Sequence, residues 1–209
     1  MSAILEATTA QEVRDLIAKG ESVDAMDEDG DTALHLAVDV EVAKALLEAG
    51  ADIDAKNNCG LTPLHVAENV EITKFLIDQG ADVHEEDVQG MTPLHFAAMY
   101  GQAEVIQVLV QAGADIQATD EDDGRSPLHY AARNGNAEAT RILIELGADV
   151  ELEDNFGETP MDLAEGETLK VFQSWREKHR LNDIAQSSRP SDLATPDDYM
   201  ARKSRGRMM

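Results

Sequence analysis

Four histidines recur along much of the sequence at nearly constant spacing: His35, His65, His95 and His129. An imidazole nitrogen binds zinc and exchanges protons near neutral pH, so a group of histidines is a candidate metal or acid–base site. Zinc ligands must converge to about 2 Å from one ion. Whether these side chains can converge depends on the elements that carry them.

A second candidate combines the single cysteine, Cys59, with His65 six residues later. A thiol beside a histidine can act as a nucleophile activated by a base, but the sequence offers no third group to orient the histidine. One cysteine excludes an intramolecular disulfide and a cysteine-rich metal site, and it favours a reducing compartment. We therefore interpret Cys59 as a lone surface thiol.

Two acidic clusters, residues 27–31 and 120–124, have the composition of calcium-binding loops. An EF-hand loop requires glycine at its sixth position and glutamate at its twelfth, and neither cluster has this spacing, which leaves only weak adventitious calcium binding. No carboxylate pair is placed in an apolar stretch that could raise its pKa, and the sequence has no phosphate-binding loop or nucleophile elbow. We expect no catalytic residue, no metal and no cofactor.

Composition restricts the class of partner. The 209 residues include 42 acidic and 17 basic side chains, for a net charge of −25. Direct binding of nucleic acid or of an anionic membrane needs a positive surface, so both are disfavoured and a basic protein partner is favoured. Residues 1–6 have no features of a secretory signal, and the longest apolar run, 105–110, is too short to span a membrane. We expect a cytoplasmic protein.

The elements that position these residues follow from an internal repeat. A tetrad of the type Thr-Pro-Leu-His occurs four times and once in degraded form, at residues 32–35, 62–65, 92–95, 126–129 and 159–162. A Gly-Ala-Asp marker follows each of the first four, at residues 50–52, 80–82, 113–115 and 147–149. Two markers in constant order at one period indicate a repeat architecture. The low aromatic content, 4%, agrees with a core of small aliphatic residues in repeated helical layers.

The third unit illustrates the local structure expected of one repeat. Thr92 is a good N-cap and Pro93 fits the first helical turn, so a helix begins there and ends near Gly101. A second helix follows with an apolar stripe over 105–110, and Gly113 ends it. The turn residues that follow predict an extended segment, here termed a finger, that leads to the next tetrad. One unit cannot bury its own apolar stripes, so the units must stack.

These paired markers resemble those of the ankyrin repeat family, which has a period of about 33 residues and the signature Thr-Pro-Leu-His-x-Ala. The resemblance covers about residues 29–165. It implies an all-α solenoid of stacked helix–turn–helix units with extended β-turn fingers. The expected domain, residues 1–185, divides into an N-terminal cap (1–28), four repeats (29–58, 59–88, 89–122 and 123–155) and a C-terminal cap (156–185). Residues 186–209 are expected to form a flexible basic tail.

The resemblance also assigns the histidines. Stacked helical layers lie about 8–10 Å apart, so no two of these histidines can share a zinc ion. The family pattern implies that each histidine supports its finger through a hydrogen bond to the finger backbone. In the closing unit Asp162 replaces the histidine, which fits a terminal unit that supports no further finger. The caps are expected to contain a second helix over 12–20 and a pair of helices over 159–164 and 168–181.

Two departures from a regular repeat concern length. The segments 37–42 and 67–72 lack three residues that are present in 98–105, so a tighter turn between the paired helices is expected there. Either a shape-specific partner site or the general tolerance of turns to length changes explains this shortening. The fourth finger carries the opposite change, one extra residue within 120–125.

The negative charge belongs to the repeats. Residues 1–166 contain 36 acidic and 8 basic residues, whereas residues 167–209 contain 6 and 9. Many of the acids lie in the fingers, which line one rim of the concave face in the ankyrin family, so this face is expected to be strongly negative. Solubility and the steering of a basic partner explain the charge equally well.

The candidate contact patch combines family positions that usually face solvent with the acids of the fourth finger. Met, Tyr and Arg side chains are typical anchors of protein interfaces. The predicted partner-binding residues are Met91, Met99, Tyr100, Asp120, Glu121, Asp122, Asp123, Arg125, Arg133 and Asn134. Phe96 and Tyr130 are expected to pack between units instead.

The sequence therefore favours a non-catalytic protein–protein interaction module, a scaffold, adaptor or inhibitor that binds a basic protein through an acidic concave face. One alternative is an immunity-type inhibitor whose carboxylates mimic nucleic acid and block a nucleic-acid-processing enzyme. An effector or accessory subunit of an enzyme, and a membrane adaptor that uses the basic tail, are further alternatives. The tail is also a candidate to fold back onto the acidic groove. We expect a monomer or a heteromeric complex.

Overall fold

The computed structural model describes residues 2–187. Within this range the regular structure is helical, apart from an isolated antiparallel bridge between Met26 and Thr32. The expected all-α class is confirmed. The described part of the chain divides into two units, with the boundary between Val171 and Phe172. No helix in the described part is both long and apolar enough to cross a membrane.

The helices follow the order expected of paired units. Their bounds are Ala3–Glu6 (η1), Ala10–Ala18 (α1), Val40–Glu48 (α2), Val70–Asp78 (α3), Pro93–Met99 (α4), Ala103–Gln111 (α5), Pro127–Arg133 (α6), Ala137–Glu145 (α7) and Gly166–Ser187 (α8). α1 matches the second helix expected in the N-terminal cap to within two residues. The tail expected over 186–209 lies outside the described residues from position 188 on.

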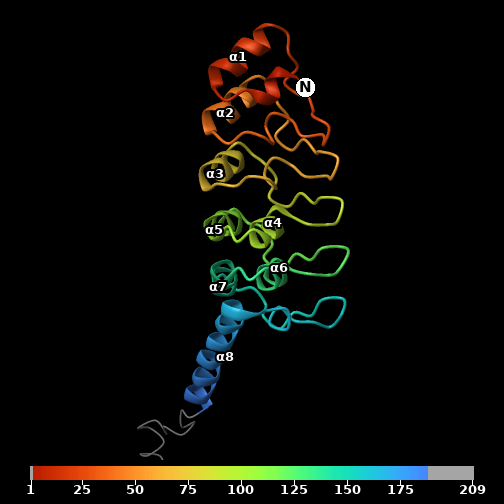
Figure 1. Cartoon of the computed structure of the whole chain (residues 1–209). Coiled ribbons are helices and arrows are strands. Elements are labelled where there is room, and N and C mark those ends of the chain that lie inside the picture. Colours follow the sequence, from red (N-terminus) through yellow and green to blue (C-terminus); the bar gives the residue numbers. More distant parts are fainter. Residues whose placement is uncertain (1, 188–209) are drawn as a thin grey trace, which may run out of the picture. The chain divides into compact units, whose positions relative to one another are not determined.

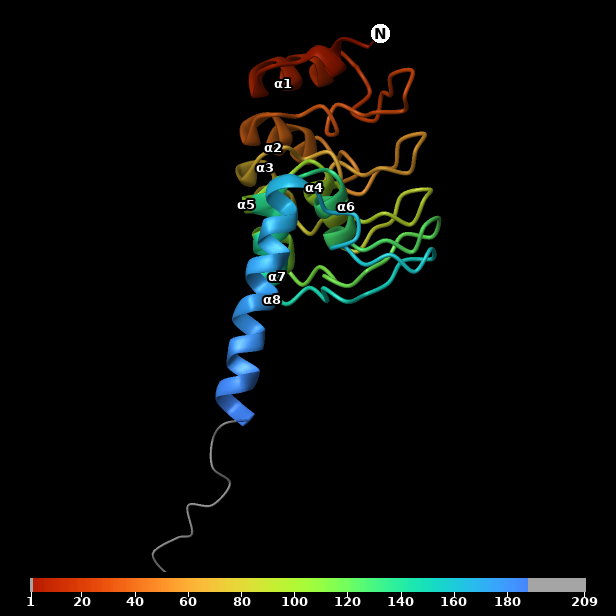
Figure 2. The same ribbon diagram turned by 60° about the horizontal axis from the view of Figure 1, so that its bottom comes forward.

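Two columns of helices and a row of fingers make up the first unit. α1, α2, α3, α5 and α7 follow one another in one column, here termed the outer helices (Figure 1). α4 and α6 pack against each other and against α5 and α7, and are termed the inner helices. The fingers project from the side of the inner helices, as Figures 1 and 2 both show.

Part of the core lies between successive outer helices, and buried residues of the inner helices complete it. Leu46, Leu76, Leu109 and Leu143 occupy equivalent positions in α2, α3, α5 and α7, and each is at most 1% exposed. Burying one leucine contributes about 1.5–3 kcal/mol. Because every repeat buries such a residue against its neighbours, stacking supplies the apolar contacts that a single repeat lacks.

Tetrad chemistry explains where the inner helices begin. In α4, Thr92 caps the helix in a reciprocal arrangement with His95, and Pro93 occupies the first turn. Ser126 and His129 cap α6 in the same way. The helix start predicted at Pro93 is therefore confirmed. Beyond α4, Gly101 adopts a φ of +72°, a left-handed conformation that suits glycine after a helix.

The shortened repeats differ from expectation. Helices are expected after their tetrads, but the structure has single turns there, at residues 33–36 and 63–66. The tetrad of the C-terminal cap is also followed by a single turn, at residues 160–163. Only eight positions separate the tetrad threonine from the start of α3, against eleven for α5. Asn69 must already cap α3, with its side-chain oxygen accepting from the N–H of Ile72. The missing residues therefore remove most of the inner helix and not only the connecting turn.

Neighbouring fingers are joined by backbone hydrogen bonds. The N–H groups of Asn58, Val88, Glu121 and Asn155 donate to the carbonyl oxygens of Asp29, Cys59, Gln89 and Asp123 at 2.8–3.1 Å. Gly90 permits one of these approaches, because a Cβ atom at this position would lie 2.8 Å from the backbone nitrogen of Glu121. Each finger is thus fixed in register on the next.

Candidate functional site

The four tetrad histidines join successive repeats. In each of them, Nδ1 accepts the backbone N–H of the tetrad threonine or serine at 3.0–3.1 Å. Nε2 donates to a carbonyl oxygen of the next finger at 2.9–3.1 Å, in the pairs His35–Leu61, His65–Met91, His95–Arg125 and His129–Glu158. The predicted bond to the finger backbone is confirmed. Among the described residues, no group of three or more His, Cys, Asp or Glu side chains is arranged to hold a metal ion.

Burial favours the neutral imidazole at His65, His95 and His129. Desolvation lowers the pKa of His65 and His129, and it lowers the pKa of His95 to about 4. The carbonyl acceptors oppose this shift but do not outweigh the loss of hydration. The neutral ring with its proton on Nε2 is the form that makes both hydrogen bonds, so these histidines hold repeats together.

One side chain in each finger organises the turn at its tip. The Oδ1 atom of Asp87 accepts the N–H groups of Gln89 and Met91 at 2.8 and 2.9 Å. Equivalent pairs of bonds are made by Asp27, Asn57, Asp120 and Asp154. These side chains satisfy backbone donors that would otherwise lack a partner, so part of the negative charge has a structural role.

Several other acids at the finger tips are exposed, and apolar side chains lie among them. The exposed acids are Glu28, Asp29, Glu86, Glu121, Asp122 and Glu153. Val88 is 70% exposed and Phe156 is 67% exposed. Large apolar side chains bordered by polar residues are typical of protein interfaces. We term these eight residues the finger face.

Five of the ten predicted contact residues are exposed: Tyr100, Glu121, Asp122, Arg133 and Asn134. Tyr100 is 67% exposed and directly follows α4, while Arg133 ends α6. Two further residues, Met99 and Asp123, are half-buried. The binding role of these residues stays a prediction.

The remaining three predicted contact residues, Met91, Asp120 and Arg125, are buried, so the expectation that they face solvent is wrong. Their exposed fractions are 4–6%. The backbone of Met91 is bound on both sides, because its N–H donates to a finger carboxylate and its carbonyl accepts from a tetrad histidine. Asp120 organises its finger turn and also accepts the hydroxyl of Tyr130 at 2.7 Å. Burial and this hydrogen bond raise the pKa of Tyr130.

Arg125 is enclosed by carboxylates of the fourth repeat and the C-terminal cap. Its Nε donates to Asp154 Oδ2 at 3.1 Å, its Nη1 donates to Asp123, and its Nη2 lies 3.8 Å from Glu158 Oε2. The guanidinium carbon lies 5.6 Å from the ring centroid of Phe156, within cation–π range. Burial alone would raise the pKa of Asp154, but two backbone N–H groups and the guanidinium outweigh it and lower the pKa.

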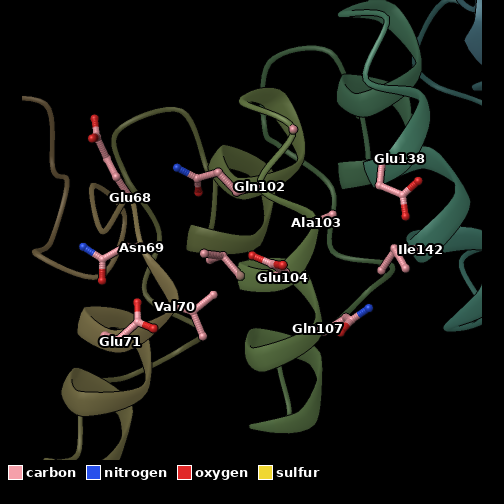
Figure 3. A pocket seen from close by; sticks show the side chains of 12 residues that line it. Glu68, Asn69, Val70, Glu71, Gln102, Ala103, Glu104, Gln107, Glu138 and Ile142 are labelled. Carbon is pink, nitrogen blue, oxygen red and sulfur yellow. The ribbon is translucent and has the colours of Figure 1, made fainter.

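A pocket of about 650 Å³ lies where the shortened second repeat meets the third. Its lining includes four glutamates from three successive repeats: Glu68, Glu71, Glu104 and Glu138 (Figure 3). Sequence reasoning missed these residues. The signal that could have found them is the three-residue shortening at 67–72, which brings the start of α3 opposite the connection between α4 and α5.

A smaller pocket of about 280 Å³ shares Glu68 and Gln102 with the larger one. It lies toward the inner helices, because Phe96 of α4 and Tyr100 line it. Leu61, His65 and Val66 of the shortened repeat complete the wall. Of the residues predicted to contact a partner, Tyr100 is thus part of a defined hollow.

Carboxylates also crowd one another where the outer helices lead into the fingers. Partial burial raises the pKa of Asp54, and the nearby charges of Glu85, Asp82 and Asp52 add to the rise, although the N–H of Asp82 donates to Asp54 at 3.1 Å. Because the folded-state pKa lies above the unfolded value, the fold loses stability as pH rises through this range.

Asp54→Asn is therefore expected to raise the urea midpoint of unfolding slightly at pH 7. It should leave the midpoint unchanged at about pH 3, where the carboxyl is protonated in both states. Glu86→Gln, which removes an exposed charge next to Glu85 in the sequence, is the control. A lower midpoint for Asp54→Asn at pH 7 would contradict the crowding argument.

The comparisons with known proteins agree with this architecture. Two family models described as ankyrin repeats match the sequence, one with three copies over residues 39–120 and one with many copies over residues 109–164. Among solved structures, the ankyrin repeat domain of Bcl-3, described as a unique member of the IkappaB protein family, is 33% identical with a TM-score of 0.68. The alignment covers 81% of this chain and 79% of that one. No curated protein sequence matches the chain.

Family models and solved structure thus agree on the repeat that the tetrads, the paired helices and the fingers define. Ankyrin repeats form protein–protein interaction modules. The chain belongs to the ankyrin repeat family.

Proposed function

We propose that the chain is a non-catalytic module that binds a positively charged segment of a partner protein on the finger face. The observation that supports this proposal is the imbalance of charge, with 36 acidic and 8 basic residues in positions 1–166. Arg125 is buried among carboxylates, and three other basic residues form ion pairs: Arg14–Glu48, Lys56–Glu85 and Arg141–Glu138. The positive charge of the repeats therefore does little to neutralise the finger face.

Two kinds of contact support this choice of partner. The exposed carboxylates attract basic groups before contact and raise the association rate, an effect that salt screens over about 8 Å at physiological ionic strength. Val88 and Phe156 offer apolar area that contributes affinity once water is excluded. The segment that fits best is basic, with apolar side chains among its charges.

A pull-down tests the proposal. The protein is immobilised, exposed to native lysate at low salt and eluted with a salt gradient, and the captured proteins are identified by mass spectrometry. We expect one basic protein at near-stoichiometric yield. If that protein is a nucleic-acid-processing enzyme, loss of its activity at a one-to-one ratio would identify the inhibitor form of the proposal, with carboxylates in place of phosphates.

The proposed compartment is the cytoplasm, where the exposed thiol of Cys59 stays reduced.

Matched charge variants distinguish specific capture from general attraction. Glu121→Gln combined with Asp122→Asn removes two charges from the finger face, and it is expected to reduce the captured amount several-fold and to lower the eluting salt concentration. Asp78→Asn combined with Glu145→Gln removes two exposed charges from the outer helices and should leave capture unchanged. Equal losses for both pairs, or a mixture of basic proteins eluting at low salt, would show that the charge serves solubility.

A further inference from the structure

We propose that the smaller pocket at the junction of the second and third repeats binds one arginine side chain of the partner. Tyr100 would stack on the guanidinium, and Glu68 would pair with it. This inference rests on the proposed function, because it identifies where one basic side chain of the partner docks. Nothing in the family match assigns this site.

The size of the pocket suits a single side chain. Its volume of about 280 Å³ falls below the range of about 300–1,000 Å³ that is usual for small-molecule and cofactor sites. Leu61 and Val66 contribute apolar side chains to its lining, which can cover the aliphatic stem of a long side chain. The carboxylate of Glu68, which also lines the pocket, then decides which long side chain fits.

Aromatic rings form one wall of the pocket and are held by the fold. His65 meets Phe96 edge to face, with ring centroids 5.5 Å apart, and its Nε2 is already bound to the carbonyl of Met91. Phe96 and Tyr100 have centroids 6.4 Å apart and are tilted by 45°. Because Tyr100 is 67% exposed, its ring is accessible to a partner. An arginine stacks on such a ring more readily than a lysine does.

Glu68 supplies the charge that favours a cation. It is exposed and lies on the border of both pockets, and within the described part of the chain it has no ion-pair partner. A carboxylate can accept two parallel N–H bonds from a guanidinium, which a lysine cannot offer. The combination of a ring and a carboxylate at one small hollow therefore selects arginine.

The next junction shows why this hollow is special. There, Asn136 occupies the place that Gln102 has here, and its amide nitrogen donates to the carbonyl oxygens of Ala98 and Met99 at 3.0 and 2.7 Å. Gly101 lets Asn136 approach, since a Cβ atom at this position would lie 3.0 Å from the Asn136 amide carbon. The shortened second repeat lacks the helical turn that would offer such carbonyls, so the corresponding space stays open.

The test uses the full chain, ¹⁵N-labelled, and three peptides of sequence Ac-Gly-Ser-X-Ser-Gly-NH₂ in which X is arginine, lysine or citrulline. Citrulline has the shape of arginine without its charge. The arginine peptide is expected to shift the amide signals of the pocket residues, the lysine peptide to bind more weakly, and the citrulline peptide to leave these signals unchanged. Tyr100→Ala and Glu68→Gln should each weaken arginine binding about tenfold.

Two control variants separate the pocket from the general charge of the protein. Asp78→Asn removes an exposed charge from α3, and Glu145→Gln removes one from α7; neither should alter arginine binding. The Tyr100 and Glu68 side chains are exposed, so their variants should keep the parent melting temperature, which verifies folding.

Each outcome bears on a distinct claim. If the signal shifts are confined to the finger face, or if the arginine peptide does not bind at low salt, the pocket inference is overturned. The proposed function is then decided by the pull-down alone. Equal binding of the lysine and arginine peptides would overturn the choice of arginine. Arginine binding in the pocket, together with failure to capture a basic protein, would keep the pocket and overturn the proposed function.

Discussion

Replacing Arg125 by alanine will lower the free energy of unfolding by about 3–5 kcal/mol, the usual effect of removing one partner from a buried ion pair. The side chain of Asp154 is fully buried, and that of Arg125 is 8% exposed. Without the guanidinium, Asp154 keeps a buried charge with no cation beside it, and the ion pair of Arg125 with Glu158 of the C-terminal cap is also lost. Urea unfolding followed by circular dichroism measures the change.

Arg133→Ala is the matched control for this variant. Arg133 is also in the fourth repeat, ends α6 and is exposed, so its removal should change the unfolding free energy by no more than about 0.5 kcal/mol. If the two alanine variants proved equally stable, the buried cluster around Arg125 would have no structural role.

The second prediction with a large effect is a loss of folding stability at acidic pH, caused by the buried imidazole of His95. The pKa of His95 is about 4 in the folded state against an unperturbed value of 6.5, so below pH 6.5 the unfolded state takes up a proton that the folded state does not. This depressed pKa gives stability that is complete above pH 6.5 and is lost as pH falls toward 4. At about 1.36 kcal/mol per pH unit, His95 alone accounts for a loss of about 2 kcal/mol between pH 6.5 and pH 5.

His95→Asn isolates this contribution from the other titrating groups. The variant loses the bond to the next finger and is less stable at pH 7.5, but its deficit relative to the parent should shrink by about 2 kcal/mol at pH 5. Urea titrations of both proteins at the two pH values measure the deficit. His84→Asn, at an exposed histidine of the third finger region, is the control for the substitution itself. A deficit that did not change with pH would show that His95 is protonated in the folded protein.

The sequence carries the repeat fold because each tetrad specifies local geometry on its own. Threonine, proline and histidine at fixed spacing define a capped helix start and a bond to the next finger. Asp162 of the closing unit keeps the first of these contacts although it is not a histidine. In the closing unit its Oδ2 accepts the N–H and the hydroxyl of Thr159 at 2.9 and 2.6 Å, reproducing the local contact of the histidine.

The site was less accessible from the sequence because its side chains take partners from other repeats. Arg125 stands at a position that a repeat pattern leaves variable, and nothing near it in the chain indicates that Asp154 lies opposite. The sequence shows that the segment 67–72 is short. The consequence is structural, because the eight positions between Thr62 and the start of α3 leave no room for a full inner helix. Glu68 is a candidate because it lines the pocket beside Tyr100, and the sequence does not reveal this pocket.

The backbone hydrogen bonds between fingers fix the finger tips at regular intervals. Each finger is tied to the next by an N–H donated to a carbonyl at 2.8–3.1 Å, so the separation of the tips follows the repeat spacing, which is about 8–10 Å in stacked helical layers. An extended peptide advances about 3.3 Å per residue, so about three residues of such a peptide span one repeat. If the basic segment proposed above runs along the fingers in this conformation, every third residue meets a finger tip, and the spacing of its basic residues then decides how well it fits.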